Sequence, residues 1–226
     1  MSALPDVKKL VQQTQRYEFA DGLRDLQLAI MMAAFGLVTW FTFDHAKTWL
    51  VWTVQLAESL GVVGRWIPLL VTLIPALLTL AVLFVMRFIR HRWLWQGSGY
   101  VKPVRWIVPR RVTLIAFGII LLATAVGALL QSTLPEEELF LLRVILVSSG
   151  WSFGYTLIEV GRRLNISRYV PVGLLGIVAT TPPLILTLTV GQTALASGLI
   201  WGVLLATSSI QPLRQAARVA GETRHE

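Results

Sequence analysis

The sequence predicts an all-α protein, a polytopic transmembrane helical bundle. Of its 226 residues, 55% are hydrophobic and 14% are charged, whereas soluble domains carry roughly 25% charged residues. The mean hydropathy is +0.66, and apolar runs long enough to cross a bilayer alternate with short polar segments. The net charge of +8 comes from basic residues between these runs, so it indicates membrane topology and not nucleic-acid binding.

The apolar runs predict six spans, with a kink where proline interrupts the second and fifth. The prolines concerned are Pro75, Pro182 and Pro183. The predicted spans cover residues 26–43, 67–88, 112–131, 139–160, 169–190 and 194–210. Residues 1–25 form a cytoplasmic amphipathic segment, 26–210 the six-span bundle, and 211–226 a cytoplasmic tail.

Two segments are helical in pattern but do not match a transmembrane span. Within residues 1–25, apolar side chains recur at steps of three and four, which predicts an amphipathic helix on the membrane surface. Residues 44–66 also place apolar side chains along one face, but they carry many polar groups for burial in lipid. These groups are Asp44, Lys47, Gln55, Glu58 and Arg65. We therefore predict an interfacial or re-entrant helix after span one.

The segment 87–111 orients the bundle. It contains seven Lys or Arg and no acid, and such segments stay on the cytoplasmic side. With this segment inside, both termini are cytoplasmic, and all of the 20 Lys and Arg except Lys47, Arg65 and Arg143 lie on that side. A seventh span at 44–66 would break this distribution.

The same basic segment is the first candidate site. Aromatic rings alternate with cations in it, a pattern typical of a surface that contacts anionic lipid headgroups. We predict an ordered cytoplasmic platform that contacts lipid, with no catalytic role. Its residues are Arg90, Arg92, Trp93, Trp95, Tyr100, Lys102, Arg105, Trp106, Arg110 and Arg111.

A second candidate site is a stripe of small residues in the last span. Small side chains at every fourth position let another helix approach closely. The stripe consists of Ala194, Gly198, Gly202 and Ala206, and Gly150 with Gly154 repeats it more weakly in span four. The pattern fits packing within the bundle, and it equally fits a homo-oligomer or docking onto another membrane subunit.

A third candidate is a polar cavity near the Pro182–Pro183 break, because broken transmembrane helices line cavities in transporters. Its side chains would be Ser152, Tyr155, Thr156 and Thr181. The ionisable groups within the spans, Arg143 and Glu159, lie near span ends. We expect Arg143 to extend to the membrane surface, toward the acidic residues 136–138.

No catalytic, cofactor or metal site is predicted. The chain has no Cys and three His, and it lacks a nucleotide-binding or nucleophile motif. Glu18, Asp21 and Asp44 only partly follow the aspartate motif of CDP-alcohol phosphotransferases. Asp44 stands about 30 Å from Asp21 at helical rise, too far to share a metal. We expect Glu18, Asp21 and Asp25 to form a solvated helix cap that pairs with nearby arginines.

Two short motifs, Tyr17-x3-Asp21-Gly22 and Gly99-Tyr100-Val101, resemble features of uncharacterised bacterial multi-pass membrane proteins. The resemblance implies a bacterial cytoplasmic (inner) membrane and no biochemical activity. The sequence thus favours a non-enzymatic membrane protein that acts through helix packing, as a homo-oligomer or accessory subunit. The alternatives are a small transporter or lipid-handling protein and, third, a phosphotransferase-type enzyme.

Overall fold

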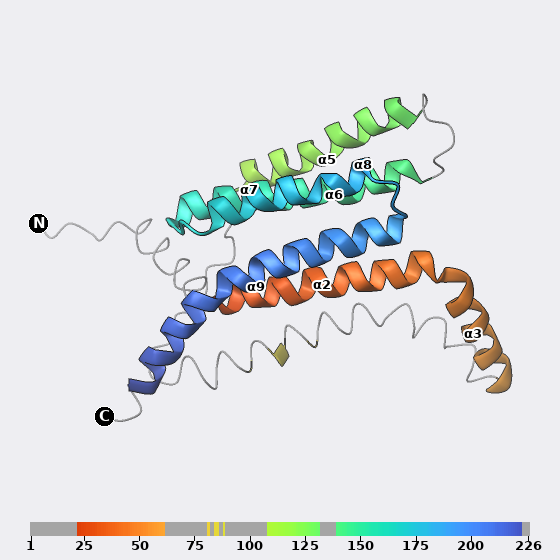
Figure 1. The fold of residues 1–226 in the computed structure, drawn as a ribbon, viewed down its shortest axis with the longest axis horizontal. Coiled ribbons are helices and arrows are strands. Elements are labelled where there is room, and N and C mark those ends of the chain that lie inside the picture. Colours follow the sequence, from red (N-terminus) through yellow and green to blue (C-terminus); the bar gives the residue numbers. More distant parts are fainter. Residues whose placement is uncertain are drawn as a thin grey trace, which may run out of the picture.

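The structure, a computed structural model, describes residues 22–61, 81, 84, 85, 88, 108–131 and 139–222, in which all the regular elements are α-helices (Figure 1). In Figure 1, α2 and α9 run side by side as one layer, and α5, α6 and α7 form the other. The helices are α2 (Leu23–Asp44), α3 (Ala46–Ser59), α5 (Arg110–Gln131), α6 (Phe140–Leu164), α7 (Tyr169–Thr180), α8 (Pro182–Ile185) and α9 (Val190–Glu222).

Within these described ranges, four helices are long and apolar enough to cross a membrane, namely α2, α5, α6 and the Val190–Gln215 part of α9. The segment Tyr169–Ile185 is apolar but shorter. The all-helical membrane class is therefore confirmed, whereas six spans and the side of the termini stay predictions. The amphipathic segment before residue 22 and most of the predicted span 67–88 lie outside the described residues.

Several predicted boundaries move. The last helix does not end at residue 210, because α9 continues through Pro212 to Glu222. Pro212 lacks an amide hydrogen for the helix ladder, and the end of α9 runs at an angle to its first part (Figure 1). The segment after span one forms the separate helix α3, which has 14 residues and turns away from α2 after His45 (Figure 1).

Helices α2 and α9 touch backbone to backbone. A Cβ atom added to Gly36 would lie 2.7 Å from the Ala194 carbonyl oxygen and 3.0 Å from the Gly198 Cα. One added to Gly198 would lie 2.6 Å from the Met32 carbonyl oxygen. Small residues permit this approach, and dispersion contacts along it hold membrane helices together. At one end of the pair, the Thr189 hydroxyl donates to the Asp44 carboxylate at 2.8 Å.

Helices α6 and α7 make a second close contact. A Cβ on Gly154 would lie 2.8 Å from the Gly173 carbonyl oxygen, and one on Gly173 would lie 2.6 Å from that of Gly154. The turn between the helices depends on Asn165, which has a left-handed φ of 54° and ends α6. Thr181, between α7 and α8, keeps a helical backbone conformation, and the helical backbone ends at Leu186, which is extended.

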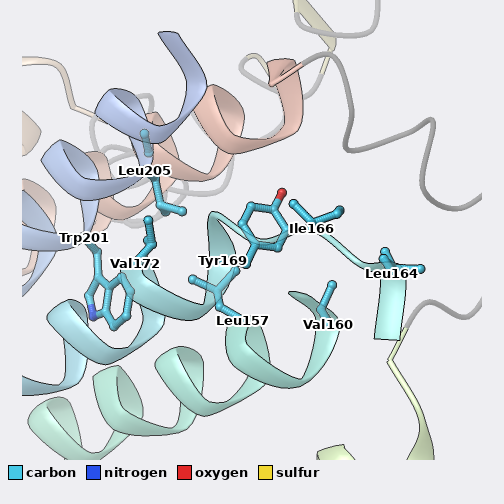
Figure 2. Packing of buried hydrophobic residues seen from close by; sticks show 9 residues of the cluster. Leu157, Val160, Leu164, Ile166, Tyr169, Val172, Trp201 and Leu205 are labelled. Atoms are coloured by element: carbon cyan, nitrogen blue, oxygen red, sulfur yellow. The ribbon is translucent and has the colours of Figure 1, made fainter. Parts of the chain in front are cut away.

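The two layers meet around Trp201 of α9. The edge of its six-membered ring fills the space over Gly176, where an added Cβ would lie 2.0 Å from it, and its indole nitrogen faces Gly150. The ring of Phe153 packs edge-on against it at 4.8 Å. Beside Trp201 the core continues as an apolar cluster that includes Leu205, Val172 and Leu157 (Figure 2).

The close contact between α2 and α9 can be tested with one substitution at two glycines. Gly198→Leu places a side chain where the α2 backbone already lies, and overpacking of this kind costs about 1–3 kcal/mol or more. We expect a clearly lower unfolding temperature in detergent, measured by circular dichroism. Gly118→Leu on α5 is the control, because a Cβ there meets no atom within 4 Å in the described structure. Equal losses for the two variants would contradict the packing.

Candidate functional site

Among the residues that the structure describes, the most buried charged group is Asp25, at the start of α2. Its side chain is 1% exposed. Its carboxylate accepts hydrogen bonds from Arg168, directly before α7, from Tyr169 of α7 and from Ser208 of α9. Arg168 Nε and Nη2 each lie 3.1 Å from Asp25 Oδ2. The Tyr169 hydroxyl donates to Asp25 Oδ1, and the Ser208 hydroxyl lies 3.5 Å from Oδ2. We call Asp25, Arg168, Tyr169 and Ser208 the Asp25 cluster.

Local backbone geometry places each member of this cluster. Gly22 precedes α2 with φ +72°, and a Cβ on it would lie 2.7 Å from the Ser209 carbonyl oxygen. Only glycine fits this close approach and left-handed conformation easily, and it brings the first turn of α2 against α9. On the other side, the Ile166 amide donates to the Gly161 carbonyl at 2.8 Å. This bond closes the α6–α7 turn and directs the chain into Arg168 and Tyr169.

The cluster joins three helices by charge and hydrogen bonds. Burial of a carboxylate is expensive unless several donors replace its hydration. Arg168 supplies the opposite charge, and its guanidinium also lies 5.2 Å from the centre of the Tyr169 ring. Because Arg168 is 26% exposed, the cluster touches solvent or headgroups on one side only. Its chemistry is that of a structural or switching ion pair.

The prediction that Asp25 belongs to a solvated cap is wrong. Its partner is Arg168, which is distant in sequence, and its carboxylate is inside the bundle. The predicted topology contained a signal for this contact. It placed the start of span one and the 161–168 loop on the same membrane side. A carboxylate and a basic loop at one end of a bundle can pair, but the sequence does not say which helices are neighbours.

A second buried charge, Arg143, lies at the opposite end of the layer formed by α6 and α7. Its residue exposure is 6%. Its Nη2 donates to the carbonyl oxygens of Pro183 and Leu184, at 3.1 Å each, and to that of Leu186. These carbonyls belong to the end of α8 and the extended segment behind it, where no helical amide is available. Arg143 therefore caps the C-terminal end of α8.

The prediction that Arg143 extends toward the acidic residues 136–138 stays a prediction, and the described contacts of Arg143 are with backbone carbonyls. The residues 136–138 to which it was assigned lie outside the described structure. Reasoning from sequence treated the arginine and the Pro182–Pro183 break as separate features. They are linked in the structure, because the last carbonyls of the short helix α8, which begins at Pro182, lack helical amides and a buried guanidinium has several donors to satisfy them. Glu159, the other ionisable residue in the spans, pairs with Arg162 at 3.3 Å.

The predicted small-residue stripe lies inside the bundle. Ala194, Gly198 and Gly202 contact α2, and Ala206 packs against the core cluster. Gly150 faces Trp201 and Thr180, and Gly154 faces α7. The stripe thus serves intramolecular packing, one of the two interpretations, and a role in oligomerisation stays a prediction.

The predicted cavity residues lie in α6 and near the α7–α8 break, where their hydroxyls mostly bond locally. Thr156 donates to the Ser152 carbonyl at 2.8 Å, and Thr181 donates to that of Ile177 at 2.9 Å. Thr181 also accepts from the Trp151 indole at 3.2 Å, which sequence reasoning missed. Tyr155 is half-buried. Of the predicted lipid platform, Arg110 and Arg111 are exposed at the start of α5, and the other members lie outside the described residues.

These features define the class: four apolar helices indicate an integral membrane protein, with buried ion-pair and arginine–carbonyl contacts near the ends of its helices. Comparison with known protein families, curated proteins and solved structures found no match. In the described part of the chain, no group of three or more His, Cys, Asp or Glu could hold a metal ion.

The burial of the Asp25 cluster predicts that Asp25→Asn lowers the free energy of unfolding more than the same carboxylate-to-amide change does at a more exposed residue. Asp25→Asn leaves Arg168 without its opposite charge, and loss of one member of a buried pair typically costs roughly 3 kcal/mol or more. Tyr169→Phe should cost roughly 2 kcal/mol, because a hydrogen bond to a charged group is lost. The double variant should lose less than the sum, since the residues interact directly. Unfolding in detergent with increasing denaturant measures all three.

Glu159→Gln is the matched control for that experiment. It removes one charge from the more exposed Glu159–Arg162 pair, which should contribute little to stability. A similar loss from Glu159→Gln and Asp25→Asn would mean that the Asp25 cluster is no stronger than a surface pair.

Proposed function

We propose that this membrane protein is a small non-enzymatic transporter for a small neutral polar solute. The observation that carries the proposal is the buried Arg143, which binds carbonyl oxygens at the C-terminal end of α8 and in the extended segment that follows it. Within a bilayer, non-helical backbone persists where it is buried in protein or lines a water-filled cavity. In transporters such breaks form substrate sites.

The arginine strengthens this argument. The last carbonyls of a helix have no intrahelical amide partner, and at the end of α8 a buried guanidinium bonds to them. Placing Arg143 among apolar helices costs free energy, so ionisable residues in such positions commonly mark functional sites. Here the guanidinium stabilises the break instead of removing it. The sequence therefore maintains an irregular backbone at this end of the bundle by an expensive contact.

The side chains near the break support a neutral solute. Trp151 and Thr181 share a hydrogen bond, and the hydroxyl of Thr180 is fully buried. On α6, Ser148 and Ser152 are also buried. Hydroxyl and indole groups can exchange hydrogen bonds with hydroxyl or amide groups of a solute. They do not supply the charge that an ion would require in place of its hydration.

The hypothesis of a homo-oligomer or accessory subunit stays a prediction. In this arrangement α2 occupies the stripe of α9, so a partner would have to bind another face. The exposed apolar residues of α5, such as Leu122 and Leu129, suit lipid as well as protein. Dimerisation of a transporter remains compatible with the proposal.

Osmotic experiments on reconstituted vesicles test the transport function. After mixing with concentrated glycerol or urea, vesicles containing the protein should recover volume faster than protein-free vesicles, as followed by stopped-flow light scattering. Trp151→Phe and Thr181→Val should each change this rate several-fold, because they alter groups at the break. Val178→Ala is the control, since Val178 is 68% exposed on the lipid-facing side of α7. Equal rates with and without protein, for both solutes, would overturn the proposal.

A further inference from the structure

Three polar side chains on one face of α9 are buried and lack a hydrogen-bond partner within the described structure. They are Thr193, Ser197 and Trp201, with exposures of 0%, 9% and 2%. The atoms concerned are the Thr193 and Ser197 hydroxyl oxygens and the Trp201 indole nitrogen. Buried polar groups nearly always have partners, from protein or from ordered water. Three exceptions in succession on one helix therefore require an explanation.

The other buried hydroxyls of the bundle show that these exceptions are unusual. Thr180 donates to the Gly176 carbonyl at 2.7 Å, and Ser209 donates to that of Ala206 at 2.6 Å. Ser148 likewise bonds to its own helix, at 3.1 Å from the Ile145 carbonyl. This local bond is the usual way for a helix to satisfy a hydroxyl. Thr193 and Ser197 do not form it, so their hydroxyls remain available for another partner.

The spacing of the three residues matches a row of water molecules. They follow each other at four-residue steps, which correspond to about 6 Å of helical rise and a rotation of about 40°. A water molecule that accepts or donates at about 2.8 Å on each side spans roughly 5.6 Å. One water between each neighbouring pair can therefore join all three groups. Internal waters typically bind buried groups of this kind.

We propose that Thr193, Ser197 and Trp201 hold a row of ordered water molecules that is reached from the Arg143 end of the bundle. Thr193 lies one turn into α9, just after the extended segment whose Leu186 carbonyl is bound by Arg143. The row ends at Trp201. Beyond it, Leu205 is fully buried in the apolar core, together with Leu157 and Val172 (Figure 2). Water thus enters about half of the bundle and stops.

This inference deepens the proposed transport function and rests on it for the purpose of the row. A solute with hydroxyl or amide groups would replace the waters and bond to the same three side chains. The row itself makes a separate physical claim, namely that one buried face of α9 is wet. That claim can be tested without measuring transport.

The chain contains no Cys, so a single introduced thiol can report access to water. We expect Ag⁺, a probe close to water in size, to reach Ser197→Cys in the protein reconstituted in lipid nanodiscs. After desalting and unfolding, bound Ag⁺ should slow the reaction of this thiol with maleimide at least tenfold more than it slows the reaction of the thiols in two control variants. Leu199→Cys lies at the same depth and is 50% exposed on the lipid side, and Leu205→Cys lies beyond Trp201. Protection at Ser197→Cys no better than at Leu199→Cys would overturn the proposal.

Melting temperatures give a second measurement if a Cys variant does not fold. If water bridges the hydroxyls, Thr193→Val and Ser197→Ala should each lower the unfolding temperature, because a bound water loses its partner. If the row is dry, removal of an unsatisfied hydroxyl should leave that temperature unchanged or raise it, and this result would contradict the proposal. Ag⁺ protection at Ser197→Cys without solute flux would reject the transport function and retain the row of water molecules. Solute flux without Ag⁺ protection would reject the row and retain the transport function.

Discussion

The buried carboxylate of Asp25 is the constraint on which the arrangement of the two layers depends. It lies on α2, yet its charge partner Arg168 directly precedes α7. With almost no access to solvent, it must be surrounded by donors or become protonated. Tyr169 and Ser208 complete that shell, so α2, α7 and α9 can meet in few ways at this end. Such a pair contributes more to specificity than to stability.

Packing at the centre of the bundle provides the complementary constraint. Trp201 occupies the space over Gly176 and beside Gly150, so α9 can approach the other layer closely there. A side chain at Gly150 or Gly176 would meet this ring, so the two glycines set how closely α9 approaches α6 and α7. The apolar cluster between Trp201 and Tyr169 then excludes water from the middle of the bundle (Figure 2).

The sequence predicts the helical membrane class and most helix positions because hydrophobic length and proline placement are local signals. It also identifies the small residues at which helices approach, but not their partners: Gly198 meets Gly36. The Asp25 cluster was missed because its members are distant in sequence. The bonds from Arg143 to backbone carbonyls were missed because nearby acids offer an obvious partner in the sequence, whereas the carbonyls at the end of a helix leave no mark in composition. The unpartnered row on α9 has no local signal, since serine and threonine usually bond to their own helix.

The same contacts limit how a path through the bundle could open. For such a path to extend beyond Trp201, α9 would have to separate from α6 and α7, because the indole fills the space between them. The backbone contact between Gly36 and Gly198 and the bond from Thr189 to Asp44 join α9 to α2. Movement of α9 alone would break both. For the proposed transport function, a displacement of α2 and α9 together would keep both contacts, as in transporters whose halves move as rigid bodies. The Asp25 cluster spans the boundary between these two bodies, so its ion pair must break or act as the pivot.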